Sequence, residues 1–129
     1  MVAGVTATTT ASQRVLVLEN SASFREILTL HLSNAGYAVL PAEDAVVAGK
    51  LILQQAPDLI IADIHVPYLS GLEFVGALRS DPSFKDIPVI FLSSQGGLEA
   101  AARQVQAQAF LRKPVTMDRL LQTVSLCLQ

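Results

Sequence analysis

The fold is decided by one stretch of the chain, Pro57-Asp58-Leu59-Ile60-Ile61-Ala62-Asp63-Ile64-His65-Val66-Pro67. Its apolar run is short and rich in aliphatic residues, which is typical of a strand buried on both faces of a sheet. Asp63 stands at the end of this run. A carboxylate at the mouth of a buried strand indicates a site rather than an ordinary surface position.

Similar short runs alternate with longer segments of helical period, and this alternation predicts βαβ units with a parallel sheet. Pro41 ends the second run, where its missing N–H is tolerated only on an edge strand. We therefore expect an α/β fold, a (βα)5 flavodoxin-like three-layer sandwich with the strand order 2-1-3-4-5. The predicted strands are Arg14 to Leu18, Tyr37 to Leu40, Leu59 to Ala62, Val89 to Leu92 and Ala109 to Arg112.

The helix boundaries follow from capping signals and helix breakers. Ser23 and Glu26 have the spacing of a capping box, which predicts the start of the first helix, and Gly36 is expected to end it. Thr116 is the predicted cap of the last helix. The other helices are expected at about 43–55, 71–80 and 98–105.

Composition limits the function classes. The chain has 129 residues and a formal net charge of -2, which fits one domain at 14–129 after a disordered leader at 1–13. The Lys and Arg residues are scattered, so direct nucleic-acid binding is not expected. No apolar run approaches the ~18 residues of a membrane span. The lone Cys127 excludes an internal disulfide and favours a cytoplasmic protein.

Parallel strands joined by helices place their carboxyl ends on one rim, where open α/β sheets bind ligands. The sequence predicts that this rim carries Glu19, Asn20, Asp63, Ser93 and Lys113.

Four motifs in this order resemble the receiver domain of bacterial two-component response regulators, over Arg14 to Leu128. They are Val-Leu-Val-Leu-Glu-Asn (15–20), the stretch 57–67 with Ser-Gly (70–71), Ile-Pro-Val-Ile-Phe-Leu-Ser-Ser (87–94) and Ala-Phe-Leu-Arg-Lys-Pro (109–114).

The resemblance implies that Asp63 is the phospho-acceptor, taking a phosphoryl group from a sensor-kinase histidine. It further implies that Lys113 pairs with Asp63 and then with the phosphoryl group, that the Ser93 hydroxyl donates to that group, and that Ser94 leaves room for it. Pro114 is a cis-proline in the family. The alternatives are an Asp63 that only caps its turn and a solvated Lys113.

Phe110 matches the aromatic switch position that the family couples to Ser93. A plain core role is an equal alternative. His65 and Gln95 occupy the positions at which the family tunes phosphate lifetime. His31 invites a phosphohistidine interpretation, although its place beside Leu28 and Leu32 favours half-buried packing.

The resemblance also implies a Mg²⁺ site formed by Glu19, Asn20, Asp63 and the main-chain carbonyl of His65. Family members usually carry two acids after the first strand, whereas Asn20 is a neutral amide here. At about 4 Å and an effective dielectric of about 20, one unit charge pair is worth roughly 4 kcal/mol before desolvation. We therefore expect weak Mg²⁺ binding until a phosphoryl group adds oxygens. In the alternative, Asn20 is a turn residue and no metal is used.

A second departure is a shortened connection between Ser93 and Lys113. The Gly-Ala pair that normally precedes strand five reads Gln106-Ala107, so the fourth helix is expected to be short and to follow a flexible Gln95-Gly96-Gly97 loop. In the family this region carries the output surface. Its departure puts partner and dimer geometry in question.

Two functions fit these observations. The first is a phosphorylation-dependent switch in two-component signalling, which performs self-catalysed transfer and autodephosphorylation at most and is otherwise not an enzyme. Its partners would be a sensor histidine kinase or phosphotransfer protein, and a downstream protein or an output domain; dimerisation stays open. The alternative is a pseudo-receiver, an interaction module that is not phosphorylated. A flavodoxin or a dehalogenase-type phosphatase is disfavoured, because neither the phosphate loop nor the second Asp is present.

Overall fold

The structure is a computed structural model that describes residues 12–129. Most of the expected leader therefore lies outside the described residues. The elements in chain order are β1 (Arg14–Leu18), α2 (Ala22–Asn34), β2 (Ala38–Ala42), α3 (Ala45–Gln54), β3 (Leu59–Asp63), α4 (Gly71–Arg79), β4 (Val89–Ser93), α5 (Glu99–Gln104), β5 (Ala109–Arg112) and α6 (Met117–Cys127).

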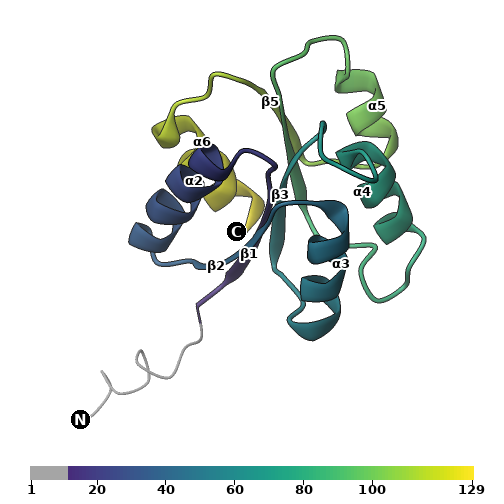
Figure 1. Cartoon of the computed structure of the whole chain (residues 1–129), viewed down its shortest axis with the longest axis horizontal. Coiled ribbons are helices and arrows are strands. Elements are labelled where there is room, and N and C mark those ends of the chain that lie inside the picture. The colour runs from purple at the N-terminus through teal and green to yellow at the C-terminus, as the bar shows by residue number, and fades with distance from the viewer. Residues whose placement is uncertain (1–11) are drawn as a thin grey trace.

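The five strands are parallel and lie in the order β2-β1-β3-β4-β5, as predicted. Helices α2 and α6 cover one face of the sheet and α3, α4 and α5 cover the other (Figure 1). Pro41 lies in β2 opposite Val17, and β2 is an edge strand. The missing N–H of this proline therefore interrupts no interior hydrogen-bond ladder.

Alternate strand residues face the two layers, so both faces of the sheet are buried. Val15 and Val17 pack with Leu28 and Leu32 of α2 on one face. Leu16 packs in the core on the other face, with residues of α3 and α4. Burial on both faces explains why the strands read as continuous apolar runs.

The start of α2 corrects one prediction. Its N-cap is Ser21, whose hydroxyl accepts from the Phe24 N–H at 3.3 Å, rather than Ser23. The Ser21 N–H is itself bound by a carboxylate oxygen of Glu19 at 2.9 Å, which starts the helix two residues earlier. A true capping box occurs at α4, between Ser70 and Glu73. Thr116 caps α6 as predicted.

The second strand also differs slightly from expectation, because it runs to Ala42 rather than ending at Leu40. The Ala42 carbonyl accepts from the Glu19 N–H at 3.0 Å, so pairing with β1 continues past Pro41.

Arg79 joins two loops on the α4 side of the sheet. Its guanidinium donates to the carbonyls of Val105, Lys85, Ile87 and Gln106 at 2.7 to 3.1 Å. Burial lowers the pKa of Arg79, and the nearby charge of Asp86 partly offsets that effect. The side chain thereby fixes the short α5 against the segment that leads into β4.

We predict that Arg79→Met lowers the free energy of unfolding by about 2–3 kcal/mol, because it leaves four carbonyls without a charged donor. Urea denaturation measures the loss. Arg103→Met, at an exposed arginine of α5, is the matched control and should change stability by less than about 0.5 kcal/mol. Equal effects of the two substitutions would contradict a bridging role for Arg79.

Gln106 adopts a left-handed backbone with φ of 60° just after α5. Glycine is favoured in this conformation, because a Cβ atom clashes with the backbone there.

We therefore predict that Gln106→Gly raises the free energy of unfolding by about 0.5–1 kcal/mol, as relief of strain outweighs the added freedom of the unfolded chain. Ala101→Gly, inside α5, should instead lower it by about 0.5–1 kcal/mol. Thermal unfolding of both variants checks the opposite signs.

Candidate functional site

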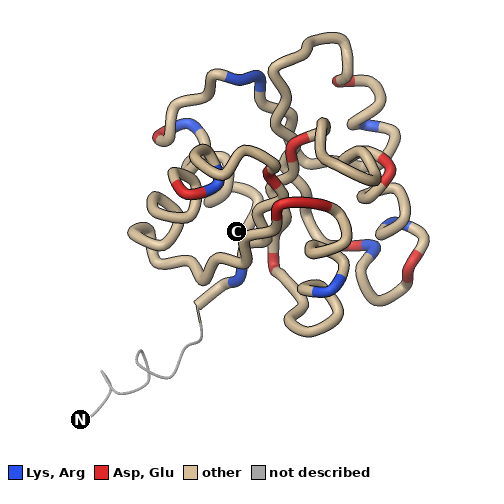
Figure 2. Tube along the Cα trace, in the orientation of Figure 1, with Lys and Arg blue, Asp and Glu red and all other residues tan. Residues whose placement is uncertain are grey.

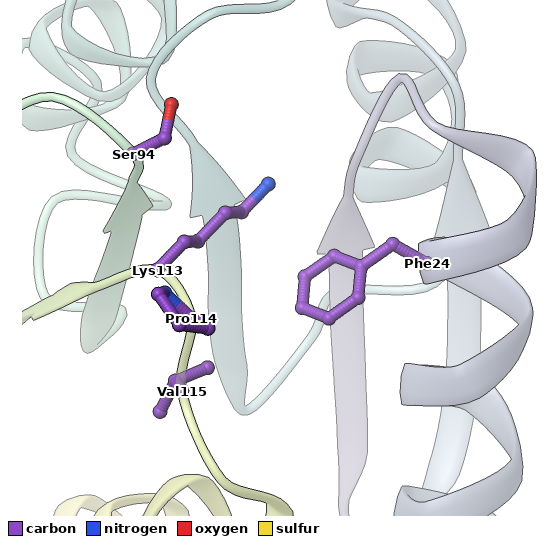
Figure 3. A pocket seen from close by; sticks show the side chains of 5 residues that line it. All are labelled: Phe24, Ser94, Lys113, Pro114 and Val115. Atoms are coloured by element: carbon purple, nitrogen blue, oxygen red, sulfur yellow. The ribbon is translucent and has the colours of Figure 1, made fainter.

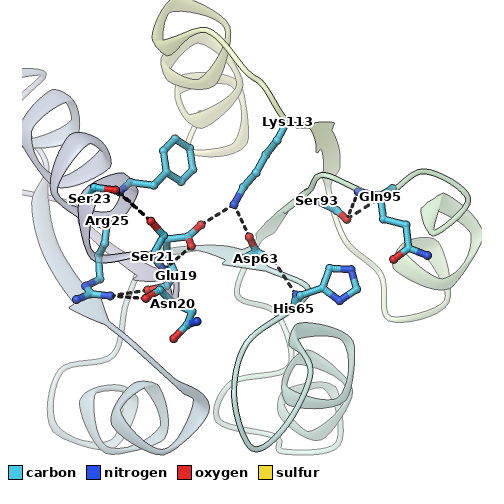
Figure 4. A network of polar contacts seen from close by, with 11 residues as sticks. Glu19, Asn20, Ser21, Ser23, Arg25, Asp63, His65, Ser93, Gln95 and Lys113 are labelled. Atoms are coloured by element: carbon cyan, nitrogen blue, oxygen red, sulfur yellow. Dashed lines mark hydrogen bonds and ion pairs between the residues drawn. The ribbon is translucent and has the colours of Figure 1, made fainter.

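The predicted rim residues come together at the carboxyl ends of the strands (Figure 4). Glu19 and Asn20 follow β1, Asp63 ends β3, Ser93 ends β4 and Lys113 follows β5. Their convergence results from the parallel sheet, which points every strand end at the same edge.

Lys113 lies between the two acids. Its Nζ is 2.8 Å from Oε1 of Glu19 and forms a second ion pair with Oδ2 of Asp63. Both acids are nearly buried, with exposed fractions of 3% for Glu19 and 7% for Asp63. Burial alone would lower the pKa of Lys113, but the hydrogen bonds that its ammonium donates to the two carboxylates, together with their charges, outweigh burial and raise that pKa above the ordinary value. The lysine is therefore a fixed positive charge.

The remaining carboxylate oxygens are held by backbone N–H groups. Oε2 of Glu19 accepts from the Ser21 N–H at 2.9 Å, and Oδ1 of Asp63 accepts from the His65 N–H at 2.7 Å. These bonds fix the orientation of both acids. Asp63 therefore does cap the turn after its strand, but only its Oδ1 atom does so, and its Oδ2 atom pairs with Lys113.

The loop after Asp63 depends on Gly71. A Cβ atom at this position would lie 2.5 Å from the Asp63 carbonyl oxygen, and the Gly71 N–H donates to the Ile64 carbonyl at 2.8 Å. The Ser-Gly pair at 70–71 therefore lets the helix α4 begin directly against the acid-bearing strand.

Ser93 is fully buried, and its hydroxyl bonds with the backbone of Gln95, at 3.1 Å to the carbonyl and 3.0 Å from the N–H. The Ser93 carbonyl accepts from the Lys113 N–H at 2.9 Å, which ties β4 to the start of the lysine loop. The Gln95 and His65 side chains are exposed at the two lips of the site.

Asn20 is exposed beside the acid pair. Its carbonyl and that of Glu19 accept from the Arg25 guanidinium at 3.4 and 2.7 Å. Arg25 therefore holds the turn that contains Asn20 against the start of α2.

The other predicted residues lie farther out. Phe110 is half-buried against the core on the α5 side and borders a cavity of about 170 Å³ with residues of α5; its role as a switch stays a prediction. His31 is half-buried on α2, in agreement with packing. The Lys113-Pro114 bond is cis, as the family resemblance implied.

Sequence reasoning missed Phe24 and Arg25. The Phe24 ring centroid lies 4.7 Å from Nζ of Lys113. Phe24 and Lys113 line a cavity of about 370 Å³ together with Ser94, Pro114 and Val115 (Figure 3). No sequence signal links a helix residue to a lysine so far along the chain.

The carboxylate oxygens of Glu19 and Asp63 are donors of the type that a hard cation prefers. Among residues 12–129, no cluster of three or more His, Cys, Asp or Glu side chains is arranged to hold a metal ion. However, the carboxylates of Glu19 and Asp63 converge on one cation, the Lys113 ammonium. Mg²⁺ typically takes one or two carboxylates together with phosphate oxygens. The two carboxylates therefore fit the donor types that Mg²⁺ takes, and the exposed Asn20 side chain beside them carries no charge.

The described part of the chain has no helix that is long and apolar enough to cross a membrane. Its Lys and Arg residues are spread along the trace rather than gathered in one place (Figure 2).

The comparisons agree with this arrangement. The chain is 32% identical over 109 residues to the phosphate regulon transcriptional regulatory protein PhoB of Pseudomonas aeruginosa, covering 83% of this chain and 48% of that protein. It is 34% identical over 110 residues to the response regulator MprA of Mycobacterium sp. (strain KMS), covering 84% and 47%. The chain thus spans about half the length of these curated relatives.

Among solved structures, the chemotaxis response regulator CheY4 of Vibrio cholerae is similar, with a TM-score of 0.85 and 30% sequence identity over 91% of this chain and 99% of that chain. The response regulator receiver domain family matches residues 15–125. With its strand order and its rim of Glu19, Asp63 and Lys113, the chain belongs to the response regulator receiver domain family.

Proposed function

We propose that Asp63 accepts a phosphoryl group from the histidine of a sensor kinase or phosphotransfer protein, and that the acyl phosphate changes affinity for a downstream partner. The observation that carries the proposal is the Lys113 ammonium held between two nearly buried carboxylates. A plain structural ion pair needs only one acid. With two carboxylates, Glu19 and Asp63, and a single ammonium, the site keeps a net negative charge that can attract a metal cation. That cation can in turn bind the phosphoryl group.

In the transfer, a carboxylate oxygen of Asp63 attacks phosphorus while the bond from phosphorus to the donor imidazole nitrogen breaks. Lys113 supplies positive charge to the phosphoryl oxygens, since its raised pKa keeps it protonated. The Ser93 hydroxyl would donate to the phosphoryl group after leaving its bond to the Gln95 carbonyl. Later hydrolysis restores Asp63, so the protein catalyses only its own modification.

A bound Mg²⁺ would neutralise charge on the phosphoryl oxygens. Glu19, Asp63 and the main-chain carbonyl of His65 would hold it, with the weak amide donor Asn20. The output would pass to a separate protein or to a further domain of the same protein, through a shift between two conformations.

The second candidate is a pseudo-receiver that binds partners without phosphorylation. Asn20 supports it, because the neutral amide lowers the charge of the site. The six-residue α5 also supports it, since this region has no side-chain cap and departs from the family length.

We predict that acetyl phosphate with Mg²⁺ adds one phosphoryl group to the protein, detected by intact mass measurement, and that Asp63→Asn abolishes the gain. Asp58→Asn is the matched control, since Asp58 is an exposed acid whose side chain accepts from the Arg14 N–H; it should keep the gain. No mass increase at saturating Mg²⁺ would favour the pseudo-receiver.

We further predict that Asn20→Asp raises the affinity of the resting protein for Mg²⁺ by about tenfold or more, because it restores one charge to the donor set. Calorimetric titration of both proteins without phosphodonor measures the change. Equal affinities would rule out charge at this position as the limit on metal binding.

A further inference from the structure

The Phe24 ring gives Lys113 a third attraction besides the two carboxylates. The ring centroid lies 4.7 Å from Nζ, within the range of a cation–π interaction. Figure 3 shows the ring reaching from α2 toward the segment of Lys113, Pro114 and Val115 across the open cavity.

The position of this ring is linked to that of Glu19. Phe24 lies in the first turn of α2, where its N–H donates to the cap Ser21, and the Ser21 N–H donates to Glu19. Arg25, the next residue, donates to the Glu19 carbonyl at 2.7 Å. The aromatic ring and the acid are therefore held by one local network, so both draw the ammonium to the same place.

The same two carboxylates would serve the ammonium and a divalent cation. A divalent cation gains full use of Glu19 and Asp63 only when the ammonium withdraws from at least one of them. Any group that stabilises the ammonium in its bridging position therefore competes with the metal.

We propose that Phe24 is a positioning residue: its ring holds the Lys113 ammonium across Glu19 and Asp63 and thereby lowers the affinity of the resting protein for Mg²⁺. The inference rests on the proposed role of these acids as the cation and phosphoryl site. Phe24, an apolar residue that is not itself a metal ligand, would thus influence when Mg²⁺ binds to the site.

The test is titration of the whole chain with Mg²⁺ alone, by calorimetry. Phe24→Leu keeps an apolar side chain but removes the ring, and it should raise the Mg²⁺ affinity about two- to fivefold. Phe24→Tyr keeps the ring and should match the parent protein. Phe24→Trp should lower the affinity, since indole attracts cations most strongly and the cavity of about 370 Å³ can receive it.

A double-mutant cycle separates positioning from a structural effect. In a Lys113→Met background no ammonium remains to be held, so adding Phe24→Leu should leave the Mg²⁺ affinity unchanged. An equal rise in both backgrounds overturns the proposal, as does an unchanged or lower affinity in Phe24→Leu. Absence of Mg²⁺ binding in every variant overturns it as well.

Thermal unfolding confirms that each variant is folded, and if Phe24→Leu does not fold, the comparison of Phe24→Tyr with Phe24→Trp decides in its place. No phosphodonor is present in these titrations. A failure of this inference is therefore distinct from a failure of phosphoryl transfer to Asp63, which the mass measurement detects.

Discussion

One ammonium group, that of Lys113, holds the carboxyl ends of three strands together. It bonds to Glu19 after β1 and to Asp63 at the end of β3, while its own backbone follows β5. Two nearly buried carboxylates side by side lose hydration and repel each other, and the Lys113 ammonium offsets both costs. The rest of the rim is arranged around this pairing, and each acid is kept in place by a backbone N–H.

The sheet order makes this arrangement possible. β1 and β3 are neighbours, so the two acids lie at adjacent strand ends, whereas β4 lies between β3 and β5. Lysine therefore has to reach past the end of β4, and its long side chain can do so. The hydrogen bond from the Lys113 N–H to the Ser93 carbonyl fixes the backbone of the lysine beside the end of β4. A shorter cationic side chain at this position would not reach from β5 past β4 to the two acids. The strand order therefore requires a residue as long as lysine here.

Much of the fold could be predicted because its signals are local. The five strands are apolar runs, and Pro41 alone indicated which strand lies at an edge. The N-cap of α2 could not be predicted in the same way, because serine is a good N-cap at both 21 and 23. Which serine caps the helix depends on the Glu19 carboxylate. Glu19 takes the Ser21 N–H and thereby selects Ser21. The predicted rim residues lie together at the strand ends, but no local signal indicated that Phe24 lies beside them.

The sequence by itself determined the alternation of strands and helices and the acids at strand ends, because each rests on neighbouring residues. Only the tertiary structure decided which charges meet: Glu19 and Lys113 are 94 residues apart, and Phe24 contacts the same ammonium from helix α2. These contacts depend on how the helices pack on the sheet and how far each side chain extends. For that reason the sequence predicted which residue types form the site, whereas the contacts of the Lys113 ammonium were decided by the tertiary structure.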